Sequence, residues 1–101
     1  MKEVAEYMKR EKWDVVLLSE VRASGRGLVW LGQAENLVVV VHAEKAAVML
    51  RGEALRRWCE GGQRKRMDAR HVAVKVQEWV LVATYMPVWS YGRGEEIEAE
   101  R

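Results

Sequence analysis

Short apolar runs rich in valine set the strongest constraint on the fold of this chain. Residues 36–42 read NLVVVVH and residues 46–52 read AAVMLRG, with only the tripeptide AEK between them. β-branched residues favour extended backbone, and two such runs joined by so short a connection predict a β-hairpin. Residues 14–18, DVVLL, form another continuous run, which is typical of a strand buried on both faces in a parallel or central sheet position.

Further periodic patterns complete an expected α/β fold. Residues 2–12 carry apolar side chains at helical spacing, which predicts an amphipathic helix before the DVVLL strand. Residues 28–32, LVWLG, predict another strand, and residues 53–60 predict a short helix that ends at two glycines. Residues 71–76, HVAVKV, alternate cleanly, which indicates an antiparallel strand with one wet face, and residues 79–85 pair with it after a tight turn.

The composition is that of one globular domain. The chain has 101 residues, of which 50% are apolar and 32% are charged, and this length fits one small domain. The single cysteine, Cys59, excludes an internal disulfide and fits a reducing compartment. No apolar run approaches the roughly 20 residues of a membrane helix, and the N-terminal stretch is too charged for a signal peptide. We therefore expect a soluble, intracellular protein without a membrane partner.

The charges are unevenly distributed along the chain. The net charge of +2 is too small to indicate a partner by itself. Residues 63–70, QRKRMDAR, are basic and are expected to form a polar loop, either a solvated turn or a contact to a nucleic-acid backbone. The stretch from Glu95 is mostly acidic and has the pattern of a helix that begins there.

Three residues at the ends of predicted strands are candidates for a functional site. Glu20 follows the DVVLL strand, where ligands gather in open α/β sheets, and Mg²⁺ often binds only one or two protein carboxylates. The phenol of Tyr85 can donate a hydrogen bond to a phosphate oxygen, and Arg70 can pair with the same phosphate. Taken one at a time, each is explained as well by an ordinary strand end, a packed rim tyrosine or a surface arginine.

Taken together and in order, the stretches DVVLLSE and VATYMP resemble the endonuclease/exonuclease/phosphatase superfamily, whose members have an exonuclease III or DNase I type fold. In that family one strand ends in a metal-binding glutamate and a later strand ends in Tyr-x-Pro. The chain is most similar to the endonuclease domains of non-LTR retrotransposons, over roughly residues 3–101. The resemblance implies Mg²⁺ at Glu20, phosphate contacts from Tyr85 and Arg70, and DNA as the partner. Ser19 stands where the family usually has glutamine.

The chain also departs from the family pattern. The family's first strand, which carries an asparagine beside the metal, would precede residue 1. Its Asp-x-Asn and Asp-His motifs would follow residue 101, and the sequence itself contains only two aspartates, Asp14 and Asp68. The resemblance therefore implies a domain truncated at both ends, which lacks the groups that align the attacking water and stabilise the transition state. We expect such a chain to be inactive alone.

The resemblance also implies an architecture. We expect a single partial domain over residues 1–101, an incomplete four-layered α/β/β/α sandwich. Its mixed, mostly antiparallel sheet would combine the strand at 14–18 with those at 36–50 and 71–85. Two alternatives stay open: a non-catalytic interaction module derived from a decayed nuclease, which self-associates through exposed sheet edges, and a phosphatase of the same superfamily.

Overall fold

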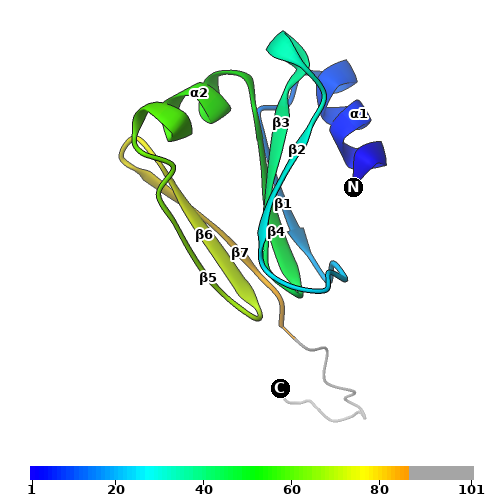
Figure 1. Cartoon of the computed structure of the whole chain (residues 1–101), viewed down its shortest axis with the longest axis vertical. Helices are drawn as coiled ribbons and strands as arrows, with labels where there is room; N and C mark the ends of the chain where they lie inside the picture. Colours follow the sequence, from blue (N-terminus) through cyan, green and yellow to red (C-terminus); the bar gives the residue numbers. More distant parts are fainter. Residues whose placement is uncertain (87–101) are drawn as a thin grey trace, which may run out of the picture.

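The strands of the chain form two antiparallel sheets that face each other (Figure 1). The computed structural model describes residues 1–86. Sheet A has the strand order β1-β4-β3-β2, and sheet B has the order β5-β6-β7. The elements in chain order are α1 Lys2–Glu11, β1 Val15–Ser19, β2 Gly27–Leu31, the 3₁₀ turn η1 Ala34–Asn36, β3 Val38–His42, β4 Ala46–Arg51, α2 Gly52–Glu60, β5 Lys65–Asp68, β6 His71–Val76 and β7 Trp79–Thr84.

Helix α1 covers one face of sheet A. Its buried residues Ala5 and Met8 pack against Val38 and Val40 of β3 and Met49 of β4. Successive side chains of a strand point to opposite faces, so the neighbouring valines of β3 point away from α1 and toward sheet B. Both faces of β3 and β4 are therefore covered, which explains why their apolar runs are continuous.

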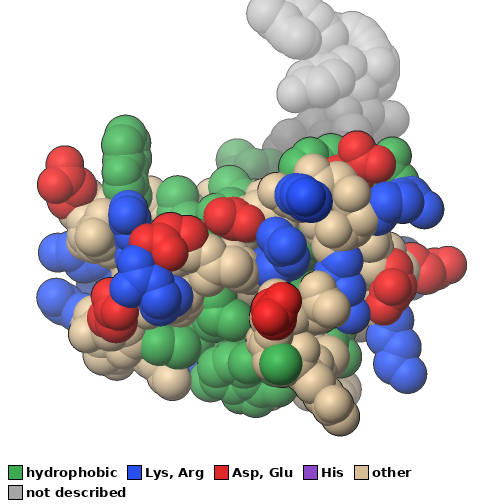
Figure 2. All heavy atoms as spheres, turned by 90° about the horizontal axis from the view of Figure 1, so that it is seen from above, with side chains coloured by type: hydrophobic (Ala, Val, Ile, Leu, Met, Phe, Trp, Pro, Cys, Tyr) green, Lys and Arg blue, Asp and Glu red, His purple; other side chains and the backbone are tan. Residues whose placement is uncertain are grey.

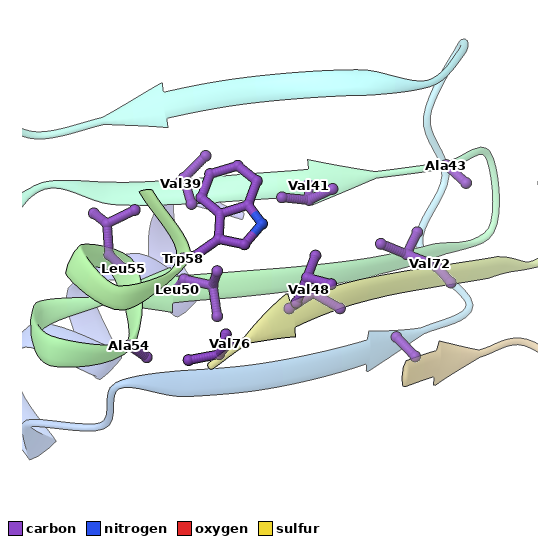
Figure 3. Packing of buried hydrophobic residues seen from close by; sticks show 13 residues of the cluster. Val39, Val41, Ala43, Val48, Leu50, Ala54, Leu55, Trp58, Val72 and Val76 are labelled. Atoms are coloured by element: carbon purple, nitrogen blue, oxygen red, sulfur yellow. The ribbon is translucent and has the colours of Figure 1, made fainter. Parts of the chain in front are cut away.

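The second face of sheet A packs against sheet B and α2. Figure 1 shows α2 across the end where the two sheets lie furthest apart. Trp58 of α2 is fully buried there, and Figure 3 shows its indole beside β3, with Val39 and Leu50 nearby. The indole N–H donates a hydrogen bond to the backbone carbonyl of Arg64 (2.9 Å). Trp58 thus fills the space between the sheets, and its hydrogen bond fixes the position of the segment that leads into β5.

The outer surface of α2 carries paired charges. Arg56 forms ion pairs with Glu53 and Glu60, and Arg57 bonds to Glu53 as well (2.7 Å). Hydrogen bonds from Arg56 and then Arg57 lower the pKa of Glu53 to about 2. Seen from above, acidic and basic side chains lie next to one another over this end of the molecule (Figure 2).

The α/β class and most expected elements are confirmed, including the β3–β4 hairpin, helix α2 and the alternating strand β6. Other expectations were wrong. The strands at 14–18 and 71–85 do not share a sheet, and all strand pairs are antiparallel, so neither sheet is mixed. β1 is an edge strand rather than a doubly buried one: its apolar run reflects packing of some side chains on each side, while Leu17 is 47% exposed.

One segment that the sequence marks as a loop is a strand. The basic residues Lys65–Asp68 form β5, which pairs with β6 along the edge of sheet B. Most of its side chains are exposed, so the polar composition reflects an edge position rather than the lack of a strand. None of the helices within residues 1–86 has the length and apolar character needed to span a membrane.

Candidate phosphate-binding site

A small polar pocket forms where three chain segments meet at one end of the two sheets. It measures about 140 Å³ and is lined by Glu20, Val21, Arg22, Lys45 and Tyr85. The first three residues follow β1, Lys45 lies in the turn between β3 and β4, and Tyr85 follows β7. The pocket thus brings together two of the candidate residues, Glu20 and Tyr85, which lie far apart in the sequence.

Backbone hydrogen bonds hold these segments together. The N–H of Val21 donates to the carbonyl of Lys45 (3.1 Å), and the N–H of Lys45 donates to the carbonyl of Ala69 (3.1 Å). The N–H of Tyr85 donates to the carbonyl of Arg70 (2.8 Å). The turn between β3 and β4 therefore joins the exit of β1 in sheet A to the turn between β5 and β6 in sheet B.

Glu20 adopts an unusual backbone conformation in this pocket. Its φ is 61°, in the left-handed region that residues other than glycine occupy at a cost of about 1 kcal/mol or more. Four other non-glycine residues within residues 1–86 share a positive φ, and none of them lines the pocket. The conformation therefore does not mark a binding site by itself. The side chain is exposed, so its carboxylate is free to meet a ligand.

Two cations share the pocket with Glu20 and Tyr85. The Nζ atom of Lys45 lies 5.9 Å from the centre of the Tyr85 ring, within the range of a cation–π contact. Within residues 1–86, neither Lys45 nor Arg22 forms an ion pair. A lysine, an arginine and a phenol around one small polar pocket offer hydrogen-bond donors to an anion such as phosphate.

Arg70 contributes to the site through its backbone. Its exposed side chain does not line the pocket, and its carbonyl accepts the N–H of Tyr85 as described above. Its own N–H donates to the Asp68 carboxylate (2.9 Å), which also bonds to His71 (2.7 Å). The hydrogen bond from Arg70 and then the one from His71 lower the pKa of Asp68. The phosphate contact of the Arg70 side chain stays a prediction.

The carboxylate of Glu20 is the group in the pocket that could coordinate a metal ion. Glu20 is the only acid lining the pocket, and residues 1–86 contain no group of three or more acidic, histidine or cysteine side chains arranged for a metal. Mg²⁺ commonly keeps several waters and binds one or two carboxylates together with substrate phosphate oxygens. In that mode Glu20 would be the protein ligand of the metal, and the two cations of the pocket would contact the phosphate.

Sequence reasoning named Glu20 and Tyr85 as candidates, and both line the pocket, but it did not name Arg22 and Lys45. Lys45 sits in the short connection between two predicted strands, where nothing in the sequence shows which part of the fold the turn approaches. No protein-family model, curated protein or solved structure matches the chain. The site is therefore interpreted from its own residues and from the two motifs, and Pro87, which completes the Tyr-x-Pro motif, lies outside the described residues.

Proposed function

We propose that this chain is a fragment of a magnesium-dependent phosphodiesterase, a DNA endonuclease of the retrotransposon type, and that it is inactive by itself. One observation carries the proposal: Glu20 and Tyr85, the two motif residues, line a single polar pocket together with two cations. Contacts between β1 and β7 across the two sheets bring the ends of these strands together, and the pocket forms at that junction.

Four of the five residues that line the pocket have a role in this proposal. Lys45 and Arg22 attract a backbone phosphate and donate hydrogen bonds to its oxygens. The hydroxyl of Tyr85 donates a further hydrogen bond, while Lys45 stays close to its ring. Glu20 holds the Mg²⁺, which when bound supplies Lewis-acid stabilisation of the phosphate charge.

The expected inactivity follows from the positions of the aspartates. Phosphoryl transfer depends on several prepositioned groups, including one that orients the attacking nucleophile. Asp14 is ion-paired to Arg51 (3.0 Å), and the carboxylate of Asp68 is occupied by His71 and the Arg70 N–H. Neither aspartate lines the pocket, so neither is placed to orient a water there.

The proposal includes an architecture. Helix α1, sheet A and sheet B would be three layers of a partial four-layered α/β/β/α sandwich, in which the outer face of sheet B faces the fourth layer. Exposed valines on that face support this assignment. The same valines favour the second candidate function, a non-catalytic interaction module.

DNA binding tests the pocket directly. We expect a short fluorescein-labelled duplex to bind more tightly with Mg²⁺ than without it, as measured by anisotropy. Glu20→Gln should remove the magnesium effect, and Lys45→Gln should weaken binding at any magnesium concentration. Glu35→Gln changes an exposed glutamate outside the pocket and should behave as the unmodified chain.

Two outcomes would contradict the proposal. Equal affinities of Glu20→Gln and Glu35→Gln with Mg²⁺ present would remove Glu20 from the metal site. Robust nicking of supercoiled plasmid by the 101-residue chain, lost in Glu20→Gln, would overturn the expected inactivity. The affinity of Tyr85→Phe for the duplex measures the contribution of the Tyr85 hydroxyl, because phenylalanine keeps the aromatic ring. Tyr7→Phe is the control.

A further inference from the structure

The outer face of sheet B combines apolar and basic side chains in an ordered way. The inner face packs into the core through alternate residues of β6 and β7, so the intervening residues point outward. Two cross-strand rows follow from the register: Arg66 is opposite Ala73, which is opposite Val82, and Lys75 is opposite Val80. A third row places Asp68 opposite His71, which is opposite Thr84. The face is therefore basic around Arg66 and Lys75, apolar toward β7 and polar at the end that carries Asp68.

The basic part of this face is a shallow groove. It has a volume of about 420 Å³ and is lined by Arg64, Lys65, Arg66, Ala73, Val74, Lys75 and Val80. No acidic side chain lines it, and none of its cations forms an ion pair within residues 1–86. Elsewhere on the described surface the arginines of α2 are paired with glutamates. The groove thus presents unneutralised positive charge over an apolar floor.

The apolar part of the face is unusually exposed. Val80 is 62% exposed and Val82 is 47% exposed. The solvated face of an antiparallel strand normally carries polar side chains, and a contiguous exposed apolar surface with a polar rim is typical of an interaction site. Within residues 1–86, both faces of the central strands β3 and β4 of sheet A are covered, whereas this face of sheet B has no covering element. Sheet A also has exposed apolar side chains, on its edge strands β1 and β2.

We propose that the outer face of sheet B binds an acidic amphipathic helix from another protein. Apolar side chains of the helix pack on Val80 and Val82, and its carboxylates pair with Lys75 and Arg66. The charge of the groove and the order of the two stripes both match such a partner. This surface is separate from the polar pocket. In the proposed four-layered architecture the same face would meet the fourth layer, so in this chain the partner helix takes the place of that layer.

Other occupants fit this face less well. Single-stranded nucleic acid binds basic grooves through stacking on aromatic side chains, and this groove is lined by aliphatic and basic residues. A strand added at the β5 edge meets Lys65 and Arg66, and charged side chains on edge strands oppose such pairing. The exposed apolar side chains lie on the outer face of sheet B and not along its β5 edge.

The test uses the full chain and a designed peptide. The probe is an acetylated helical peptide roughly 18 residues long, with leucines along one stripe and glutamates beside it, and binding is measured by isothermal titration calorimetry. We expect Val82→Lys and Lys75→Glu each to weaken binding at least about tenfold. Lys12→Glu reverses an exposed charge at the end of α1 and serves as the control. Val80→Thr keeps a β-branched side chain, so a loss of affinity there is not caused by loss of the strand.

Each result decides for or against the proposal. Selective loss of affinity in the three variants of sheet B, together with no binding of a control peptide whose leucines are shuffled, supports it. Equal binding by Lys75→Glu and Lys12→Glu overturns it, as does displacement of the peptide by a mixed-sequence oligonucleotide. Peptide affinity that rises when Glu95, Glu96 and Glu98 are replaced by glutamine would mean that the chain's own acidic segment competes for the face, and would also overturn it.

Discussion

Replacing Trp58 by phenylalanine tests how the two sheets are held together. Trp58 is 0% exposed and lies between sheet A and sheet B in the core cluster that joins them. Its indole N–H is bonded to the carbonyl of Arg64, which precedes β5. Phenylalanine keeps an aromatic ring in this space but loses the second ring and the N–H donor.

The expected loss of stability has two parts. Removing the buried atoms of the second ring costs about 1–2 kcal/mol from lost burial and the cavity left behind. Losing the indole hydrogen bond costs about 0.5–1.5 kcal/mol more, because the Arg64 carbonyl keeps the hydrogen bond that it accepts from the Lys75 N–H (3.1 Å). The total of about 1.5–3.5 kcal/mol is a large share of the stability of a domain of this size, and at about 4–8 °C per kcal/mol it lowers the melting temperature by roughly 6–28 °C.

Urea and thermal unfolding followed by far-UV circular dichroism measure this loss. Trp79→Phe is the matched control because Trp79 is 68% exposed, and we expect it to change stability by less than about 0.5 kcal/mol. If Trp58→Phe and Trp79→Phe unfold at the same urea concentration, Trp58 does not join the sheets and this account of the core is refuted.

Three further predictions concern stability and association. The hydrogen bonds from Arg56 and Arg57 that lower the pKa of Glu53 to about 2 also stabilise the fold. This stabilisation is fully present at pH values above the ordinary pKa of 4.5 and is lost as the pH falls toward about 2. The melting temperature of Glu53→Gln should therefore lie below that of the unmodified chain at neutral pH and equal it near pH 2. Gly52→Ala should destabilise by about 1–2 kcal/mol, because Gly52 has a φ of +62° and a Cβ there would lie 2.8 Å from Asp14 Oδ1. Gly25→Ala, where a Cβ meets nothing within 4 Å, is its control in urea unfolding. Sedimentation equilibrium should show self-association through the uncharged edge strands β1, β2 and β7, and a clean monomer at all concentrations would count against it.

The hairpin of β3 and β4 was predictable from the sequence because its composition and its short connection both favour it. The valine run of β3 requires cover on both faces, and α1 and sheet B supply that cover. The arrangement of strands into two sheets was not predictable, since an apolar run such as that of β1 fits an edge strand and a central strand alike. β5 was not predicted because it pairs with β6 through backbone hydrogen bonds. Such pairing does not require an apolar or alternating pattern in the side chains of an edge strand.

In the candidate site, too, some features were predictable from the sequence and others were not. Glu20 and Tyr85 each follow a predicted strand, so their positions at strand ends were predictable, and the motif order suggested that they belong together. Lys45 could not be found, because its part in the site depends on the β3–β4 turn reaching the segment before β6. Arg70 was selected for its guanidinium, whereas the structure shows its carbonyl and N–H fixing the start of β6 and the end of β7.

Paramagnetic broadening by Mn²⁺, used in place of Mg²⁺, tests the central claim most directly. Amide resonances of the ¹⁵N-labelled chain are recorded with a short DNA duplex present, before and after trace Mn²⁺ is added. We predict that broadening centres on the amides of Val21, Lys45 and Tyr85 and disappears in Glu20→Gln. Broadening centred on the acidic residues of α2, or an unchanged pattern in Glu20→Gln, would contradict the proposal that Glu20 holds a metal ion beside a bound phosphate.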